Sequence, residues 1–170
     1  TNRSKQQEMV GALLEELRLR HSYLEGQQVK SIYFGGGTPS LLSTEQLHDL
    51  LSACHDLFEV STKAEVTFEA NPDDITPSLL HAWQIAGVNR LSVGIQSFHE
   101  PLLRFMNRAH YAKEAHQALK AINAAGFNNW SMDLIYGIHQ QSDALWEEDI
   151  AQALSYRPSH LSSYCLTIEP

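Results

Sequence analysis

The sequence predicts an α/β fold with parallel strands, built as a partial (β/α)6 barrel of TIM type or as an open curved sheet. Two observations lead to this class. Short apolar or β-branched runs alternate with segments whose apolar residues recur at helical spacing, a pattern typical of βαβ units and a parallel sheet. The strands number five, fewer than the eight that close a TIM barrel. We therefore expect an incomplete barrel.

The first elements of the chain are a helix, a strand and a second helix. Apolar residues at helical spacing predict a helix over about 5–20. The apolar run 29–34 predicts a buried strand. Ser43, with Gln46 three residues later, has the form of a capping box, so a helix is expected from there to about residue 57.

The middle of the chain continues the alternation. A β-branched, alternating run predicts a strand at 64–69. A helix with Pro77 in its first turn follows, and Gly87 is expected to end it. The next strand is expected at 90–96.

The same order is repeated to the end of the chain. Two helices are expected near 100–106 and 112–124, followed by a strand at 129–136. A helix at 143–154 and a strand at 160–168 complete the prediction. Both ends of the chain resemble cuts in something longer.

Composition is that of one globular domain. The chain has 170 residues, of which 43% are hydrophobic and 19% charged. Its 12 Lys and Arg against 20 Asp and Glu argue against a nucleic-acid partner, which needs a basic surface. No apolar run reaches the roughly 20 residues that span a bilayer, and the first residues lack the apolar core of a signal peptide. With Cys54 and Cys165 as its two cysteines, the protein is expected to be cytoplasmic with reduced thiols.

A run of glycines, Gly35-Gly36-Gly37-Thr38-Pro39, follows the first strand. Glycine loses more backbone freedom on folding than any other residue, so such a run indicates that something approaches the backbone closely. A tight turn between strand and helix explains the same residues, and the run alone does not decide between a turn and a ligand cradle.

Polar residues stand at or near the ends of the other strands. Ligand sites of parallel β/α folds lie at the carboxyl ends of the strands, so these side chains are expected to converge. Taken singly, Glu69 could be a solvated strand end, Gln96 a satisfied core amide and Arg108 a surface residue. Asp133 lies in an apolar run, where an unpaired carboxylate is costly. Together they suggest a ligand with an amine, hydroxyls and a carboxylate.

These motifs, in this order, resemble the radical S-adenosylmethionine (SAM) proteins related to oxygen-independent coproporphyrinogen III oxidase. The residues that carry the resemblance are 35–39, 69–72, 94–98, 107–108 and 133–137. The resemblance implies that the methionine moiety of SAM is contacted by Gly36, Gly37 and Thr38. It also implies that the amino-acid and ribose portions are lined by Glu69, Gln96, Arg108 and Asp133.

One departure from the family is large. The family binds a 4Fe-4S cluster through a Cys-x3-Cys-x2-Cys loop after its first strand, and two isolated thiols, Cys54 and Cys165, cannot replace that loop. We therefore expect residues 1–170 to be a fragment of the core domain that lacks the first strand, the cluster loop and the C-terminal domain. Such a fragment is expected to bind no cluster and to cleave no SAM.

Two branches of the family differ in function. The HemW-like haem chaperone branch binds and delivers haem, whereas the oxidase branch decarboxylates two propionates of coproporphyrinogen III. Residues 96–98, 108–110 and 161–170 resemble the chaperone branch. The expected partners are haem or a porphyrinogen and, for a chaperone, a haem-receiving protein.

Other chemistry stays open in the sequence. A β/α enzyme outside the family could use Glu69 and Asp133 for acid–base chemistry. His110 is a candidate for contact with haem or cofactor, and no role is assigned to His139, which stands where the family has proline.

Overall fold

The computed structural model describes residues 3–167, and within them strands and helices alternate in the predicted order. Five strands form one parallel sheet whose spatial order follows the chain, so each new strand is added on the same side of the last. The strands are Val29–Phe34 (β1), Val60–Ala70 (β2), Arg90–Gln96 (β3), Trp130–Tyr136 (β4) and His160–Cys165 (β5). Residues 168–170, which belong to the predicted last strand and the chaperone-like motif, lie outside the described residues.

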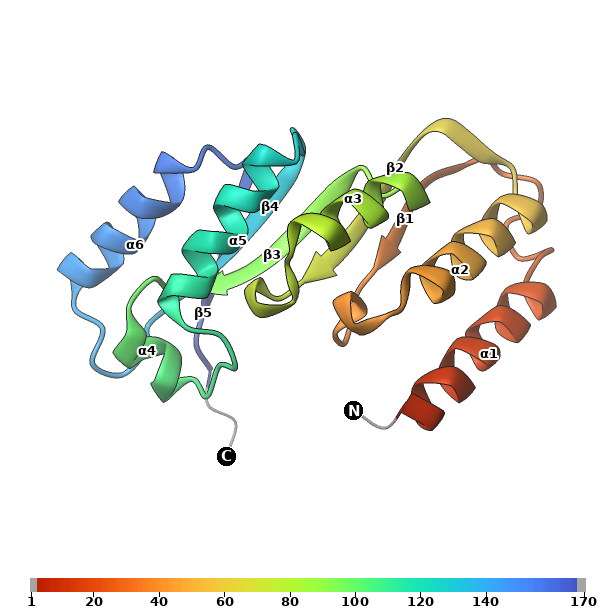
Figure 1. Ribbon diagram of the computed structural model, residues 1–170. Coiled ribbons are helices and arrows are strands. Elements are labelled where there is room, and N and C mark those ends of the chain that lie inside the picture. The colour runs from red at the N-terminus through yellow and green to blue at the C-terminus, as the bar shows by residue number, and fades with distance from the viewer. Residues whose placement is uncertain (1–2, 168–170) are drawn as a thin grey trace.

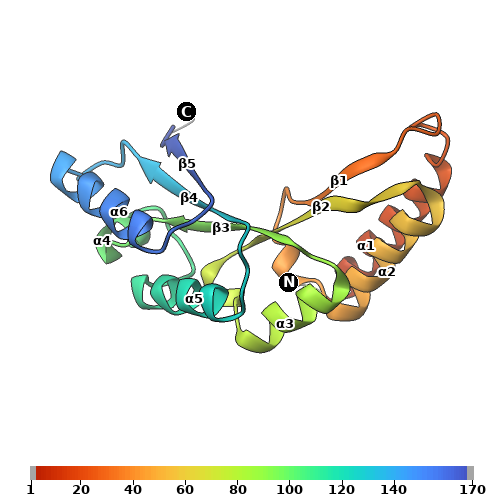
Figure 2. The ribbon, with the colours of Figure 1, turned by 90° about the horizontal axis from the view of Figure 1, so that it is seen from above.

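The sheet is curled, and helices cover its convex side, whereas its concave side carries none (Figures 1 and 2). The α-helices are Arg3–Leu19 (α1), Thr44–Leu57 (α2), Pro77–Ala86 (α3), Glu100–Phe105 (α4), Ala112–Ala124 (α5) and Asp143–Ser155 (α6). Two short 3-10 helices, Pro39–Leu41 (η1) and Pro72–Asp74 (η2), follow β1 and β2. The predicted partial barrel is therefore confirmed as a parallel half-barrel.

The predicted helix caps are present. The Ser43 hydroxyl accepts the Gln46 backbone N–H at 3.2 Å, and the Ser43 N–H donates to the Gln46 side chain at 3.0 Å. Thr76 caps α3 ahead of Pro77, and Gly87 ends that helix with a φ of 106°, in the left-handed region that favours glycine.

The hydrophobic core lies between the convex face and the helices. Its largest fully buried side chains include Phe68 from β2, Trp83 from α3 and Met132 from β4. The rings of Phe68 and Trp83 are 5.0 Å apart and tilted, a favourable aromatic pairing. None of the helices in residues 3–167 combines the length and hydrophobicity needed to cross a membrane.

The concave face is polar instead. Strand residues alternate between the two faces, and the residues interleaved with the core residues carry hydroxyls, carboxylates and amides. They are Tyr33, Thr67, Glu69, Ser92, Gln96, Ser131, Asp133 and Ser162. A parallel sheet ordinarily buries apolar residues on both faces, so this polar face indicates a surface that meets water or a ligand.

The prediction of a buried first strand was wrong. β1 is an edge strand with partly exposed residues, and Tyr33 is 58% exposed, so it does not pack in the core as expected. An apolar run indicates a strand but not its place in the sheet, which depends on partners distant in sequence. β2 is also longer than expected, because it begins at Val60. Its pairing with β1 shifts register between Val29 and Ser31.

Candidate functional site

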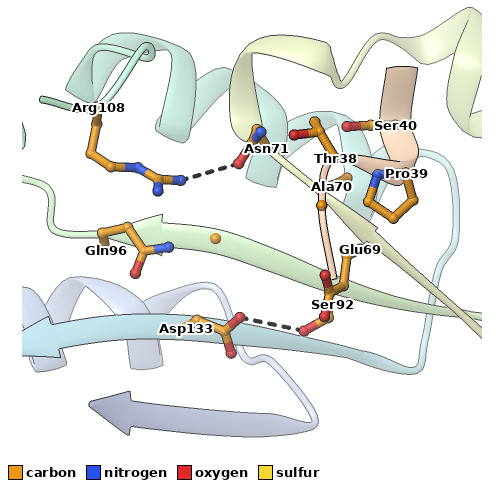
Figure 3. Close-up of a pocket in the computed structure, with 12 residues that line it drawn as sticks. Thr38, Pro39, Ser40, Glu69, Ala70, Asn71, Ser92, Gln96, Arg108 and Asp133 are labelled. Atoms are coloured by element: carbon orange, nitrogen blue, oxygen red, sulfur yellow. Dashed lines mark hydrogen bonds between the residues drawn. The ribbon is translucent and has the colours of Figure 1, made fainter. Parts of the chain in front are cut away.

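The predicted site residues meet at one cavity of about 200 Å³ at the mouth of the half-barrel (Figure 3). Six of the seven line it: Gly37, Thr38, Glu69, Gln96, Arg108 and Asp133. The seventh, Gly36, lies just outside the lining, and its backbone N–H donates to Glu69 Oε2 at 3.2 Å. The lining also includes residues that were not predicted: Pro39, Ser40, Ala70, Asn71, Ser92 and Gly94.

The glycine turn after β1 is shaped around the carboxylate of Glu69. A Cβ atom at Gly35 would overlap the Tyr33 ring and lie 2.7 Å from Glu69 Oε1, closer than packed atoms approach, so a side chain at this position would displace these groups. Gly36 has a φ of 85°, a conformation that glycine adopts without steric cost. The glycine run predicted that some group approaches the backbone closely. One such group belongs to the protein itself, the Glu69 carboxylate of the neighbouring strand.

Tyr33 holds the other oxygen of the same carboxylate. Its hydroxyl donates to Glu69 Oε1 at 2.6 Å. Burial of this group and the neighbouring Glu69 carboxylate raise the pKa of Tyr33 to about 12, although the ring as a whole is largely exposed. The hydroxyl is thus a stable hydrogen-bond donor at neutral pH, and it fixes the orientation of Glu69.

Gln96 enters the cavity above a glycine on its own strand. A Cβ atom at Gly94 would lie 2.8 Å from Gln96 Nε2 and 3.5 Å from Arg108 Nη2, so the two side chains use the space that glycine leaves. Gln96 is 9% exposed and has a φ of 67°, which is uncommon outside glycine.

Arg108 faces the cavity from the segment between α4 and α5 (Figure 3). Its Nη2 donates to Asn71 Oδ1 at 3.1 Å. Its Nε is buried and has no hydrogen-bond partner among the described residues. A buried donor without an acceptor is costly, so this atom indicates a ligand acceptor, and carboxylate is the natural partner of a guanidinium.

Asp133 lies in the middle of β4, where it pairs with Gly94 of β3. Burial raises the pKa of its carboxyl group; the hydroxyls of Ser162 and Ser92 oppose this shift, and the Glu69 carboxylate adds to it. The Ser92 hydroxyl is 3.5 Å away. Two carboxylates therefore share a partly buried cavity, which favours a cationic or hydroxyl-bearing ligand between them.

The hypothesis that His110 contacts a ligand does not fit its position. His110 is 2% exposed, and its Nε2 lies 3.0 Å from the Ile95 carbonyl oxygen, with which it hydrogen-bonds. Burial lowers its pKa, so the ring is neutral at pH 7 and braces the end of β3. His139 is exposed beside Phe105, with ring centroids 6.2 Å apart, and does not line the cavity.

Several lining residues, and Tyr33 beside them, could have been found from the sequence. Asn71 stands within the 69–72 motif, and Gly94 within the 94–98 motif. Ser92 shares the face of Gln96 by the two-residue period of a strand, as Tyr33 shares that of Gly35. That period, applied to every strand, would have identified Ser92 and Tyr33.

The site fits SAM but not the iron–sulfur cluster. The unpaired Arg108 Nε and the carboxylates of Glu69 and Asp133 match the carboxylate, ammonium and hydroxyl groups of SAM. By contrast, residues 3–167 contain no group of three His, Cys, Asp or Glu side chains arranged to hold a metal. Cys54 lies on α2 and Cys165 ends β5, at the other side of the sheet, so these thiols do not supply cluster ligands together.

Comparisons with known proteins agree with this site. The chain is 40% identical over 158 residues to the heme chaperone HemW of Escherichia coli (strain K12), which covers 93% of this chain and 42% of that protein. It is 37% identical over 164 residues to the heme chaperone HemW of Bacillus subtilis (strain 168), covering 96% of this chain and 43% of that protein. The chain thus spans less than half the length of these curated relatives.

Solved structures share the fold. Coproporphyrinogen III oxidase (HemN) from Escherichia coli, described as a radical SAM enzyme, matches with a TM-score of 0.91 and 27% identity, covering 100% of this chain and 39% of that one. The archaeal Elp3 of Methanocaldococcus infernus matches with a TM-score of 0.71 at 16% identity over 91% of this chain and 42% of that one, a likeness of fold alone. The model of the radical SAM superfamily matches residues 3–153, and the chain belongs to that superfamily.

Proposed function

We propose that this chain is the SAM-binding part of a radical SAM haem chaperone. The observation that carries the proposal is the convergence, in one cavity, of the glycine turn, two carboxylates and a guanidinium with an unpaired buried Nε. When bound with a reduced 4Fe-4S cluster, SAM supplies the radical chemistry for which the superfamily is named.

Each group of the ligand has a proposed partner. Arg108 binds the carboxylate of the methionine moiety through its unpaired Nε, because a guanidinium matches carboxylate geometry. Gly36, Gly37 and Thr38 lie along that moiety. The acceptors for the ammonium and the ribose hydroxyls are supplied by Glu69, Gln96 and Asp133, which line the cavity.

A haem chaperone is favoured over an oxidase by the relatives. Those at 32–40% identity carry the name heme chaperone HemW, whereas the oxidase HemN is 27% identical. The proposed partners are therefore haem and a haem-receiving protein, with coproporphyrinogen III as the substrate of the alternative. The free cysteines Cys54 and Cys165 fit the proposed location in the reducing cytoplasm.

SAM binding is tested by equilibrium dialysis on the protein at its natural length, with its cluster reconstituted without oxygen. Glu69→Gln and Asp133→Asn are each expected to weaken binding about tenfold, the loss of roughly one charge-assisted hydrogen bond. Glu147→Gln is the matched control, because Glu147 is exposed on α6 and does not line the cavity. Unchanged affinity in both site variants would refute the assignment.

The branch is tested with the same preparation and two ligands. Stable binding of haem without turnover of coproporphyrinogen III is the expected result. Release of carbon dioxide from coproporphyrinogen III would assign the chain to the oxidase instead. Failure to bind haem would also overturn the chaperone proposal, even if SAM binds.

A further inference from the structure

A second carboxylate network lies behind the cavity, on the helix side of the sheet. Asp149 of α6 has no exposed surface, which is rare for an aspartate. Its Oδ2 accepts the hydroxyl of Ser97 at 2.8 Å, and its Oδ1 accepts the backbone N–H of Phe98 at 2.7 Å. A helix distant in sequence is thereby fastened to the two residues that follow Gln96.

The backbone at Gln96 has a strained conformation that the surrounding structure must hold. The Ser97 N–H donates to the Ile95 carbonyl at 2.8 Å, so Gln96 is the central residue of a γ-turn, here of the rare kind with positive φ. A non-glycine residue in this conformation is strained and persists only where its surroundings hold it. The turn places the Gln96 amide above Gly94, inside the cavity.

From this geometry we infer that Asp149 is a positioning residue, which holds the turn at Gln96 so that the amide of Gln96 faces the ligand. The inference rests on the proposed SAM site. It adds a residue that lies outside the cavity lining and acts through another side chain.

The surroundings of Asp149 fit this role. Burial raises the pKa of its carboxyl group, opposed by the Phe98 N–H, by the Ser97 hydroxyl and by the charge of His99. His99 Nε2 lies 3.7 Å from Asp149 Oδ1 and 3.1 Å from the Leu145 carbonyl oxygen. The carboxylate therefore lies at a site where desolvation disfavours its charge, and the donors that oppose this cost come from the residues that follow the turn.

The alternative is that Asp149 only docks α6 onto the sheet. A double-mutant cycle separates the two roles, because residues that act through one another give non-additive effects. S-adenosylhomocysteine affinity is measured by calorimetry on the natural-length protein for Gln96→Ala, Asp149→Ala and the double variant. Each single change is expected to weaken binding about tenfold, and the double variant is expected to bind no worse than Gln96→Ala. Additive losses would overturn the inference.

Two further variants control for folding. Asp149→Asn keeps an acceptor for the Phe98 N–H and is expected to recover part of the affinity lost in Asp149→Ala. Glu147→Ala, on the exposed side of the same helix, is expected to change nothing. Melting temperatures of all variants show whether a loss of affinity is a loss of fold.

A ligand-free measurement distinguishes failure of this inference from failure of the proposed function. If wild-type protein does not bind S-adenosylhomocysteine, the proposed SAM site is refuted. Hydrogen exchange of the Ser97 amide, which donates to the Ile95 carbonyl within the turn, still tests the positioning role without ligand. Faster exchange in Asp149→Ala, but not in Glu147→Ala, supports it, and unchanged exchange overturns it.

Discussion

The hydroxyl of Tyr33 and the carboxylate of Glu69 are joined across β1 and β2 by a hydrogen bond of 2.6 Å. Glu69 accepts a second hydrogen bond from the backbone N–H of Gly36. The carboxylate that faces the proposed ligand is therefore oriented by the strand and the turn beside it before any ligand arrives. Preorganisation of this kind reduces the entropy that binding costs.

Removing the Tyr33 hydroxyl is expected to lower the affinity for SAM more than it lowers the free energy of unfolding. Tyr33→Phe deletes one hydrogen bond to a charged group, and we expect a loss of SAM affinity of about five- to tenfold. Calorimetric titration measures this loss. Tyr164→Phe is the control, since Tyr164 is a similarly exposed tyrosine on β5. Equal affinity of Tyr33→Phe and wild type would show that Glu69 does not depend on Tyr33.

The same hydrogen bond predicts how the protein responds to alkali. Because the pKa of Tyr33 is raised to about 12 in the folded protein, its contribution to stability is present below the ordinary tyrosine pKa of about 10 and is lost as pH rises through about 12. Between pH about 10 and about 12, the free energy of unfolding of Tyr33→Phe is therefore expected to fall less than that of the wild type. Urea unfolding at stepped pH measures the difference, and parallel curves would contradict the prediction.

Replacing Asp133 by asparagine is expected to stabilise the folded protein and to weaken ligand binding. Its pKa is raised by burial, so its stabilising contribution is present below the ordinary aspartate pKa of about 4 and is lost as pH rises through the folded value. At pH 7 Asp133→Asn is thus expected to raise the free energy of unfolding by up to about 1 kcal/mol while weakening SAM binding. Chemical denaturation measures the gain, which should shrink as pH approaches about 4. A variant that is less stable at pH 7 would refute this account.

Most of the fold could be predicted from local signals in the sequence. The capping box at Ser43, the glycine that ends α3 and the short alternating strands each depend on near neighbours, and each is present as predicted. The convergence of Glu69, Gln96 and Asp133 also followed from one rule, that strand ends of a parallel sheet share an edge.

Features that depend on distant partners could not be predicted in the same way. The exposure of Tyr33 is set by the position of β1 at the edge of the sheet. Asp149 is an ordinary acidic residue of a helix in the sequence, and its burial depends on contact with the turn after β3 about fifty residues earlier, at Ser97 and Phe98. Gln96 was predicted to be a site residue, but its strained backbone was not predicted, because propensity does not indicate positive φ for glutamine.

Gly94 is expected to be essential for the position of Gln96. In Gly94→Ala the new methyl group would lie 2.8 Å from Gln96 Nε2, so the amide must leave its place and SAM affinity is expected to fall about tenfold or more. Gly11→Ala is the matched control, because a Cβ at Gly11 of α1 meets nothing within 4 Å. That change is expected to stabilise the protein by up to about 1 kcal/mol through helix propensity and to leave affinity unchanged. Calorimetry and thermal melting read the two effects separately.

Arg108 gives the sharpest test of how the ligand is oriented. Arg108→Lys keeps the positive charge but removes the Nε donor and the planar fork that match a carboxylate. Affinity for S-adenosylhomocysteine is expected to fall about tenfold, whereas affinity for the analogue that lacks only the carboxylate is expected to stay the same. Arg104→Lys is the control, since Arg104 is exposed on α4 and pairs with Glu100 at 3.2 Å. If both ligands lose affinity equally in Arg108→Lys, the guanidinium supports the cavity through Asn71 and does not bind the carboxylate.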